Sequence, residues 1–325
     1  MNTHPFATLS PDRLLDLVEA LGLQPDGRLL ALNSYENRVY QVGIEDSDPL
    51  ILKVYRPSRW STAALEEEHG FALELAERDI PVVPPLIING NTLHEHAGFH
   101  YALYPRRGGH APELDDPDTR EWLGRMLGRI HALGAVEPFA HRLSLDPQRM
   151  GRESRDHILA QGLMPAHLLP AYQSLTDDLL IDIDAAFARA QGYAVIRLHG
   201  DCHPGNILWT DQGPHFVDLD DCINGPALQD LWMLLSGERA ERAMQLSDVL
   251  AGYEDFHPFD LRELHLLEAL RTLRLMSHAA WLARRWDDPA FPPAFPWFAS
   301  GRFWEDHILA LREQAAAMQE PPLSV

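Results

Sequence analysis

The spacing of apolar residues divides the chain into two parts. Up to about residue 106, short runs of strand-forming residues are separated by polar turns. Two helical patterns interrupt them, at 10–21 and at 61–80, each opened by a serine that can cap the first turn. The predicted strands cover residues 27–33, 38–44 and 50–57, with two or three more within 81–105 around the Asn89-Gly90 turn. This order predicts a small antiparallel sheet with one main helix against it.

From about residue 107 onward, apolar residues recur at helical spacing over long segments. The predicted helices cover residues 119–134, 152–161, 166–190, 227–255, 260–286 and 302–318. One strand-like stretch, residues 194–221, interrupts them with two apolar runs on either side of a polar turn. We therefore expect an α+β chain with a small antiparallel-sheet lobe at 1–106 and a larger, mostly helical lobe at 107–325.

Composition and charge narrow the class of protein. The sequence has 325 residues, 46% of them hydrophobic, but no run near the roughly 18 apolar residues of a membrane span. The N-terminal stretch has no basic region followed by a continuous apolar segment, so a secretory signal is not expected. Two cysteines cannot build a disulfide framework. These features predict a soluble cytoplasmic protein that does not bind membranes.

The net charge of −21 argues against a general nucleic-acid binder, because phosphate backbones require clustered Lys and Arg. A nucleotide is still compatible, since its few phosphates need only one lysine and a metal ion. The 17 histidines suggest metal binding, but none forms an HExxH motif or a CxxC-type cluster. Most histidines are therefore expected at the surface or in packing. A monomer is the simplest expectation.

Candidate chemistry gathers in the strand-like stretch at 194–221. Asp201 and Asn206 lie five residues apart in a Pro-Gly turn, and Asp218 returns after one hairpin. This arrangement can bring two carboxylates and an amide to one point, and such oxygen ligands suit Mg²⁺ bound beside phosphate. Each residue alone is more often an ordinary turn former. The HGDxHxxN pattern followed by DxDD favours a catalytic site over three unrelated turns.

These motifs resemble those of a known family. The segments "LHGDCHPGNILW" and "FVDLDD" resemble the catalytic core of the aminoglycoside phosphotransferase and choline kinase-like branch of the protein-kinase-like fold. The resemblance covers nearly the whole chain and includes "LNSYENRVYQV" and "VYRPSRW". It implies a bilobal fold and ATP- and Mg²⁺-dependent phosphoryl transfer. The longer matches are closest to a bacterial serine/threonine protein kinase with a role in stress responses. They imply protein Ser/Thr acceptors, the chain itself included, ahead of amino alcohols or aminoglycosides.

The resemblance assigns roles to the residues of this stretch. It implies that Asp201 is the catalytic base or orients the acceptor hydroxyl, and that Asn206 and Asp218 bind Mg²⁺. Asp218 stands at the position of the aspartate in the kinase DFG motif, so it also counts as a catalytic residue. His199 is expected to brace the loop. Asp230 is expected to hold the loop by accepting backbone N–H bonds.

Upstream residues supply the other parts of such a site. Lys53 lies in an apolar strand, where a lone lysine usually faces solvent, but the resemblance implies a lysine that binds the α- and β-phosphates. Its expected carboxylate partner is Glu68, which shares a helix face with apolar residues, and Glu67 is the alternative. Residues 101–109 fit a hinge whose backbone reads adenine.

The hairpin around residues 33–42 takes the place of a kinase glycine-rich loop, although it has no glycine. Backbone N–H groups in a turn can still face phosphate. Ser34 and Asn37 are expected to add side-chain hydrogen bonds to the nucleotide. Glu36 would repel bare phosphate, so it is expected to act near the metal or to restrain turnover. Arg38 either balances the charge of Glu36 or faces solvent.

Alternatives remain at this level. The "GDCHPGN" segment also resembles a loop of two-metal phosphoesterases, and a non-catalytic nucleotide-binding scaffold is a further alternative. Asp220 and Asp221 fit either a supporting role at the metal or substrate, or ordinary solvated loop positions. Cys202 and Cys222 flank the candidate catalytic residues, so their oxidation could switch activity off. Incidental thiols are the favoured interpretation of these two.

Overall fold

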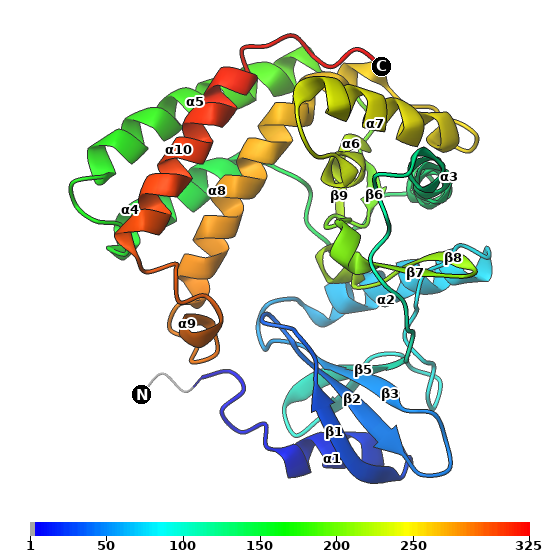
Figure 1. Cartoon of the computed structure of the whole chain (residues 1–325). Coiled ribbons are helices and arrows are strands. Elements are labelled where there is room, and N and C mark those ends of the chain that lie inside the picture. Colours follow the sequence, from blue (N-terminus) through cyan, green and yellow to red (C-terminus); the bar gives the residue numbers. More distant parts are fainter. Residues whose placement is uncertain (1–3) are drawn as a thin grey trace. The chain divides into compact units, whose positions relative to one another are not determined.

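Five antiparallel strands form one sheet in the computed structural model, which describes residues 4–325 (Figure 1). The strand order is β1-β2-β3-β5-β4, so β3 lies in the middle of the sheet. The strands are β1 (Pro25–Ala31), β2 (Arg38–Ile44), β3 (Leu50–Val54), β4 (His94–His96) and β5 (Phe99–Pro105). The predicted strand at 38–44 has the same bounds in the structure.

Helix α1 (Pro11–Glu19) covers one part of this sheet. The Ser10 hydroxyl accepts a hydrogen bond from the Arg13 backbone N–H at 3.3 Å, which fixes the first turn as the sequence predicts. Leu17 and Val18 on its inner face are fully buried. They form one apolar core with strand residues, among them Val42, Ile44, Leu52, Val54, Tyr101 and Leu103.

Helix α2 (Thr62–Glu77) begins after Ser61, whose hydroxyl accepts a bond from the Ala64 N–H at 3.2 Å. It buries the predicted face, which combines Glu68 with Phe71, Ala72 and Leu75. A carboxylate on an otherwise apolar, buried helix face requires a cationic partner. The fold therefore prepares Glu68 for an ion pair.

A buried polar network lies beside Glu68 on the same helix. The His69 Nε2 atom lies 2.7 Å from the Tyr55 hydroxyl, and its Nδ1 atom lies 2.9 Å from the Thr92 hydroxyl. Burial, reinforced by the charges of Lys53 and Arg142, lowers the pKa of His69 to about 3. The folded protein therefore holds His69 neutral at any pH near 7.

Acid should destabilise the fold through His69. Its folded pKa lies below its unfolded value, so the unfolded chain binds the proton first and stability is lost as pH falls from about 6.5 toward 3. Between pH 7.5 and 5.5 the free energy of unfolding should fall by about 1.4 kcal/mol from this residue. Urea unfolding at both pH values checks this. His69→Gln should show a smaller loss than the wild type, and His96→Gln on exposed β4 the same loss; equal losses in all three contradict the assignment.

The segment 81–105 differs from the prediction in detail. The turn that joins β4 to β5 is Ala97-Gly98, with φ of 52° and 81°. Asn89-Gly90 also forms a tight turn with positive φ at both residues, but it closes only one bridge, between Ile88 and Asn91. Both pairs adopt the left-handed conformation that hairpin turns need, so sequence alone does not tell which one joins two strands.

Helices dominate the later part of the chain. The main ones are α3 (Pro117–Gly134), α4 (Ser154–Gln161), α5 (Leu169–Arg189), α7 (Arg239–Tyr253), α8 (Leu267–Arg285) and α10 (Gly301–Ala317). The shorter ones are the π-helix η1 (Gln148–Glu153), α6 (Leu228–Leu231), the 3₁₀ turns η4 (Trp232–Leu234) and η5 (Leu261–Leu266), and α9 (Phe291–Ala294). The sequence did not predict α9.

The prediction of one helix over 227–255 is wrong. The chain leaves helical geometry after η4, passes Gly237 at φ 79° and starts α7 at Arg239. Glu238 and Glu241 form a reciprocal capping box there, which satisfies backbone N–H groups at the new helix start. The apolar periodicity continues across the break, so it concealed this boundary.

The strand-like stretch at 194–221 and the residues just after it form two small two-stranded sheets. Strand β6 (Ile196–Leu198) pairs with β9 (Ile223–Gly225), and β7 (Ile207–Thr210) forms a hairpin with β8 (Gly213–Phe216). The loop before β7 contains the turn η2 (Pro204–Asn206), and the turn after β8 is η3 (Leu219–Asp221). The candidate residues thus lie on the turns at the ends of the β7–β8 hairpin.

The residues group into two compact units. The first comprises the chain through Thr119 together with Phe139–Arg142 and Asp201–Cys222, and the second comprises Arg120–Pro138, Leu143–Gly200 and Ile223–Val325. This grouping places the 201–222 turns with the N-terminal sheet, although the sequence division assigns them to the second lobe. A lobe boundary after residue 106 stays a prediction.

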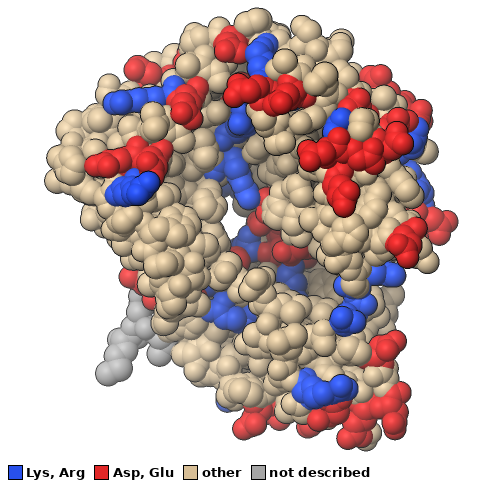
Figure 2. Space-filling model, in the orientation of Figure 1, with Lys and Arg blue, Asp and Glu red and all other residues tan. Residues whose placement is uncertain are grey.

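The surface carries charges of both signs. On the face shown in Figure 2, basic side chains lie in small separate groups among acidic ones. Within residues 4–325, none of the helices is both long enough and apolar enough to cross a membrane.

Candidate active site

Lys53 occupies the centre of the sheet. On β3 it faces Val39 of β2 and Ala102 of β5 across the ladder, and it is 6% exposed. It is also the only lysine among the 325 residues. A lysine on a central strand, buried among apolar neighbours, has a cost that only charge pairing offsets. Its position therefore indicates a specific role, in contrast to the usual solvent-facing lysine of a strand.

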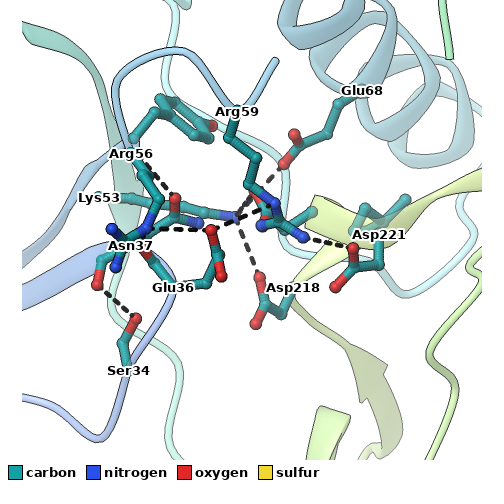
Figure 3. Close-up of polar contacts among 12 residues, drawn as sticks. Ser34, Glu36, Asn37, Lys53, Arg56, Arg59, Glu68, Asp218 and Asp221 are labelled. Carbon is teal, nitrogen blue, oxygen red and sulfur yellow. Dashed lines mark hydrogen bonds and ion pairs between the residues drawn. The ribbon is translucent and has the colours of Figure 1, made fainter. Parts of the chain in front are cut away.

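Three carboxylates surround the Lys53 ammonium (Figure 3). The Nζ atom lies 3.4 Å from Glu68 Oε1, 3.0 Å from Asp218 Oδ1 and 3.2 Å from Asp220 Oδ1. The structure thus brings Glu68, and not Glu67, to the lysine. Asp220 is a third partner that the sequence left among possible solvated positions, and it is only 4% exposed.

These contacts determine the charge states of the cluster. Burial disfavours the charged ammonium, but Asp218, Asp220 and Glu68 outweigh it and hold the pKa of Lys53 well above its ordinary value. Burial likewise raises the pKa of Glu68, against the pull of Lys53 and Arg142. For Asp220 the balance is opposite, because Arg59, Lys53 and Arg142 overcome its burial and lower its pKa. Lys53 is therefore a permanent cation at this site.

Asn206 and Asp218 are held side by side by the hairpin backbone. The Val217 N–H donates to the Asn206 carbonyl at 3.0 Å, next to the first pair of the β7–β8 ladder. Asp218 has a φ of 61°, a left-handed conformation that costs a non-glycine residue roughly 1 kcal/mol. Its side chain is 55% exposed. The strained turn thus presents the carboxylate outward beside Asn206.

Asp201 joins this pair through its own backbone. The Asn206 Nδ2 atom donates to the Asp201 carbonyl at 2.9 Å, which sets the amide so that its Oδ1 faces away from that bond. The His203 Nε2 atom lies 3.8 Å from the Asp201 carboxylate. One loop therefore fixes Asp201 and Asn206 relative to each other, although they are five residues apart.

The donor atoms fit a magnesium ion bound together with phosphate. A half-exposed carboxylate at Asp218 and an oriented amide oxygen at Asn206 are hard oxygen ligands, and Mg²⁺ uses one or two such groups plus phosphate oxygens and water. Across residues 4–325, no group of three or more His, Cys, Asp and Glu side chains is arranged to hold a metal by itself.

Asp230 anchors the chain just before Asp201. In the second unit, its two carboxylate oxygens accept backbone N–H bonds from His199 and Gly200, each at 2.8 Å. The predicted role of Asp230 is thereby confirmed. His131 adds a contact of 3.0 Å to the same carboxylate and lies 2.9 Å from the Tyr253 hydroxyl. This fully buried set fixes the backbone at His199 and Gly200.

Arg142 is a residue that the sequence did not reveal. Its Nη2 atom donates to Glu68 Oε2 at 2.8 Å, and its Nη1 atom donates to the Asp220 carbonyl at 3.0 Å. Its guanidinium lies 4.2 Å from the centre of the Trp60 ring. Glu67 accepts the backbone N–H groups of residues 140–142 at 2.7–2.8 Å. Neighbouring carboxylates of α2 thus bind the side chain and the backbone of one short segment.

Arg142→Met should lower the free energy of unfolding by about 3 kcal/mol, because it leaves Glu68 and the carbonyls of the η3 turn buried with one cation fewer. Chemical denaturation of the full chain measures this loss. Combining the change with Glu68→Gln should recover part of it, since the remaining buried group is then neutral. Strictly additive losses, or a single-variant loss below about 0.5 kcal/mol, would contradict the pairing.

The side chains of Ser34, Glu36 and Asn37 make contacts that fix the shape of the hairpin. The Ser34 hydroxyl donates to the Asn37 carbonyl at 3.1 Å, and Asn37 Oδ1 accepts the Arg56 N–H at 3.0 Å (Figure 3). Glu36 is paired with Arg56 at 3.0 Å, so Arg38 is not needed to balance its charge. Contact of these residues with a nucleotide stays a prediction.

The missing glycines of this hairpin have a structural explanation. Among the described residues, those with positive φ include none between 31 and 38, so this turn uses only conformations open to ordinary residues. Leu32 N–H donates to the Val39 carbonyl at 2.9 Å, which continues the ladder into the turn. Side-chain contacts fix the conformation of this hairpin, so it does not need the backbone freedom that glycines would give.

Both cysteines are free and buried. Burial raises the pKa of the Cys222 thiol, which makes its thiolate scarce near neutral pH. This environment supports incidental packing thiols over a redox switch.

The fold and the cluster around Lys53 define a kinase-type phosphotransferase. The chain belongs to the phosphotransferase enzyme family, whose model matches residues 28–267. This membership confirms the predicted bilobal, kinase-like α+β class and excludes the phosphoesterase alternative.

Full-length relatives give the same result. Stress response kinase A of Escherichia coli K12 is 46% identical over 320 residues, covering 98% of this chain and 97% of the relative. The protein named serine/threonine protein kinase RdoA of Salmonella typhimurium LT2 is 45% identical over 324 residues, covering 100% and 98%. The structure of an amicoumacin kinase in complex with AMP-PNP, Ca²⁺ and its ligand shares the fold, with a TM-score of 0.72 at 19% identity over 96% of this chain and 95% of that one. The predicted likeness to a bacterial stress response kinase is confirmed.

Proposed function

We propose that the chain transfers the γ-phosphoryl group of ATP, with Mg²⁺, to serine and threonine hydroxyls of proteins, its own included, as part of a stress response. One observation carries the proposal: the sole lysine lies buried between the α2 carboxylate of Glu68 and the outward-facing Asp218 beside Asn206. This combination provides a fixed cation for phosphates next to oxygen ligands for a metal.

In the proposed reaction, the acceptor hydroxyl oxygen forms the new bond to the γ-phosphorus and the bond to the bridging oxygen of ADP breaks. Asp201 accepts the hydroxyl proton or orients the hydroxyl. Lys53 stabilises the phosphate oxygens that lie over it, and Glu68 keeps the ammonium in place. Asn206 and Asp218 would hold Mg²⁺, which would neutralise charge that develops on the phosphate oxygens. Phosphoryl transfer demands mainly this positioning and electrostatic stabilisation.

The protein acceptor rests on the full-length relatives, one of which is named a serine/threonine protein kinase. The amicoumacin kinase shares only the fold, and a fold does not decide the acceptor. ATP as donor and a cytoplasmic location belong to the same proposal.

A transfer assay with γ-labelled ATP separates the possible acceptors. Purified chain is incubated with Mg²⁺ and either generic protein substrates or a set of amino alcohols and aminoglycosides. We expect label on protein Ser/Thr and on the chain itself, and none when the metal is chelated. Label on small alcohols alone contradicts the protein acceptor. Phosphate release without transfer to any acceptor contradicts the kinase reaction.

A further inference from the structure

The segment that follows strand β3 is joined to the hairpin around residues 33–42 by hydrogen bonds and an ion pair. Arg56 Nε donates to the Glu36 carbonyl at 2.9 Å and lies 3.0 Å from its carboxylate, while the Arg56 backbone N–H donates to Asn37. A tight turn follows, with Ser58 at φ 63°, and returns the chain to Arg59. The sequence "VYRPSRW" thus places two arginines, Arg56 and Arg59, next to Glu36 of the glycine-free hairpin.

Arg59 extends from the hairpin to the turn that carries the metal-ligand candidate. Its two Nη atoms bind Asp220 and Asp221 of η3, and its Nε atom lies 3.7 Å from Glu36 (Figure 3). Its side chain is 14% exposed. Asp220 and Asp221 lie two and three residues after Asp218 on the same turn, so one guanidinium joins the hairpin to the turn of Asp218.

A second link runs beside it. The Asn37 side chain is buried and hydrogen-bonds the Asp220 carboxylate, while its oxygen accepts from the Arg56 N–H. Because a planar guanidinium engages two carboxylates with fixed geometry, a lysine at position 59 could not reproduce these contacts. Asp220 also contacts Lys53 at 3.2 Å, so its placement affects the phosphate-binding cation.

We propose that Arg59 is a positioning residue that couples the hairpin to the Asp218–Asp221 turn, and so sets the nucleotide loop and the metal-ligand turn as one element. The inference rests on the proposed function, since it explains how this chain orders those parts for ATP. Ion pairs fix the conformation of this hairpin, whereas a flexible loop would change its backbone conformation to reach the nucleotide. Glu36 then serves as the hairpin end of this link, and its action near the metal or in restraining turnover stays a prediction.

The test compares the full-length chain with Arg59→Gln, Arg59→Lys and Arg28→Gln. Arg28 is an exposed arginine of β1 that forms an ion pair with nearby Asp26, so it is the matched control. Hydrogen exchange of amides in 33–37 and 218–222 is measured together with binding of a fluorescent ATP analogue, kcat and KM. In Arg59→Gln, exchange should accelerate in both segments, and kcat and analogue affinity should each fall roughly tenfold. Arg59→Lys should show smaller changes of exchange, kcat and affinity than Arg59→Gln, but should not match the wild type.

Glu36→Gln distinguishes the two ends of the link. It removes the carboxylate charge that faces Arg56 and Arg59 and leaves the Arg59 contacts with Asp220 and Asp221 in place, so exchange should accelerate in 33–37 more than in 218–222, and KM for ATP should rise more than kcat falls. Faster exchange in one segment alone in both Arg59 variants, or kcat equal to that of Arg28→Gln, would overturn the coupling. A wild type that neither binds the analogue nor transfers phosphate would refute the proposed function, while the exchange data would still decide the coupling.

Discussion

Asp201→Asn should lower kcat for phosphoryl transfer by roughly 10³-fold, the usual scale for loss of a general base. The amide is nearly isosteric, so the hydrogen bonds that the Asn206 side chain and the His203 backbone N–H donate to the Asp201 carbonyl remain. The lost property is the ability to accept the proton of the acceptor hydroxyl. Affinity for ATP should therefore change little, and the loss should appear in kcat at saturating ATP. Single-turnover transfer from labelled ATP measures the chemical step directly.

Asp211→Asn is the matched control for this prediction. Asp211 lies ten residues further on, exposed in the turn of the β7–β8 hairpin, and the same atom exchange there should leave kcat within twofold of wild type. If Asp201→Asn retains more than about a tenth of the wild-type kcat, the carboxylate acts only in positioning. A large rise in KM with kcat unchanged would instead place Asp201 in ATP binding.

Sequence patterns predicted the parts of the site that depend on local order. Glu68 could be chosen over Glu67 because helical spacing puts it on one face with Phe71 and Leu75, and that face is buried. The pairing of Asn206 with the Asp218 turn follows from a short hairpin, which brings its two ends together whatever surrounds it. Local periodicity and short-range closure were sufficient in both cases.

Contacts between distant segments were not visible in the same way. Arg142 lies 74 residues from Glu68, and Arg59 lies 161 residues from Asp220. Arg59 lies in the matching "VYRPSRW" segment, but no local pattern assigned a role to either arginine, because an arginine near a turn usually faces solvent. For Asp220 the sequence left a supporting role and a solvated turn position equally open, and the structure placed three cations around it. One available signal was overlooked: of the 27 Lys and Arg residues, only the one at position 53 is a lysine.

Lys53→Met should lower kcat/KM for ATP by roughly 10²- to 10³-fold, the scale seen when one preorganised charge at a transferring group is removed. The loss should include weaker ATP binding, because the ammonium contacts ground-state phosphates as well as the transition state.

Lys53→Arg separates charge from shape. The chain uses arginine for every other basic side chain, yet the Lys53 pocket is closed by Glu68 and Asp220 within 3.4 Å of a compact ammonium. Arginine should therefore recover less than a tenth of the lost activity. Steady-state kinetics with both variants measure these effects.

The unique lysine also permits a test that does not depend on turnover. An ATP analogue with an amine-reactive acyl phosphate should modify one side chain only, Lys53, and unlabelled ATP should prevent the modification. Peptide mapping identifies the site, and Lys53→Arg is the control that removes the amine while keeping the charge.

Modification confined to the N-terminal amine, or modification of Lys53 that ATP does not suppress, would show that phosphates do not lie over this ammonium. Suppression by ATP together with full activity of Lys53→Met would place the nucleotide at Lys53 but exclude the lysine from phosphoryl transfer. Because Glu68, Asp218 and Asp220 keep the ammonium charged, labelling in free enzyme should be slow, and only a reagent delivered by its own nucleotide should reach it efficiently.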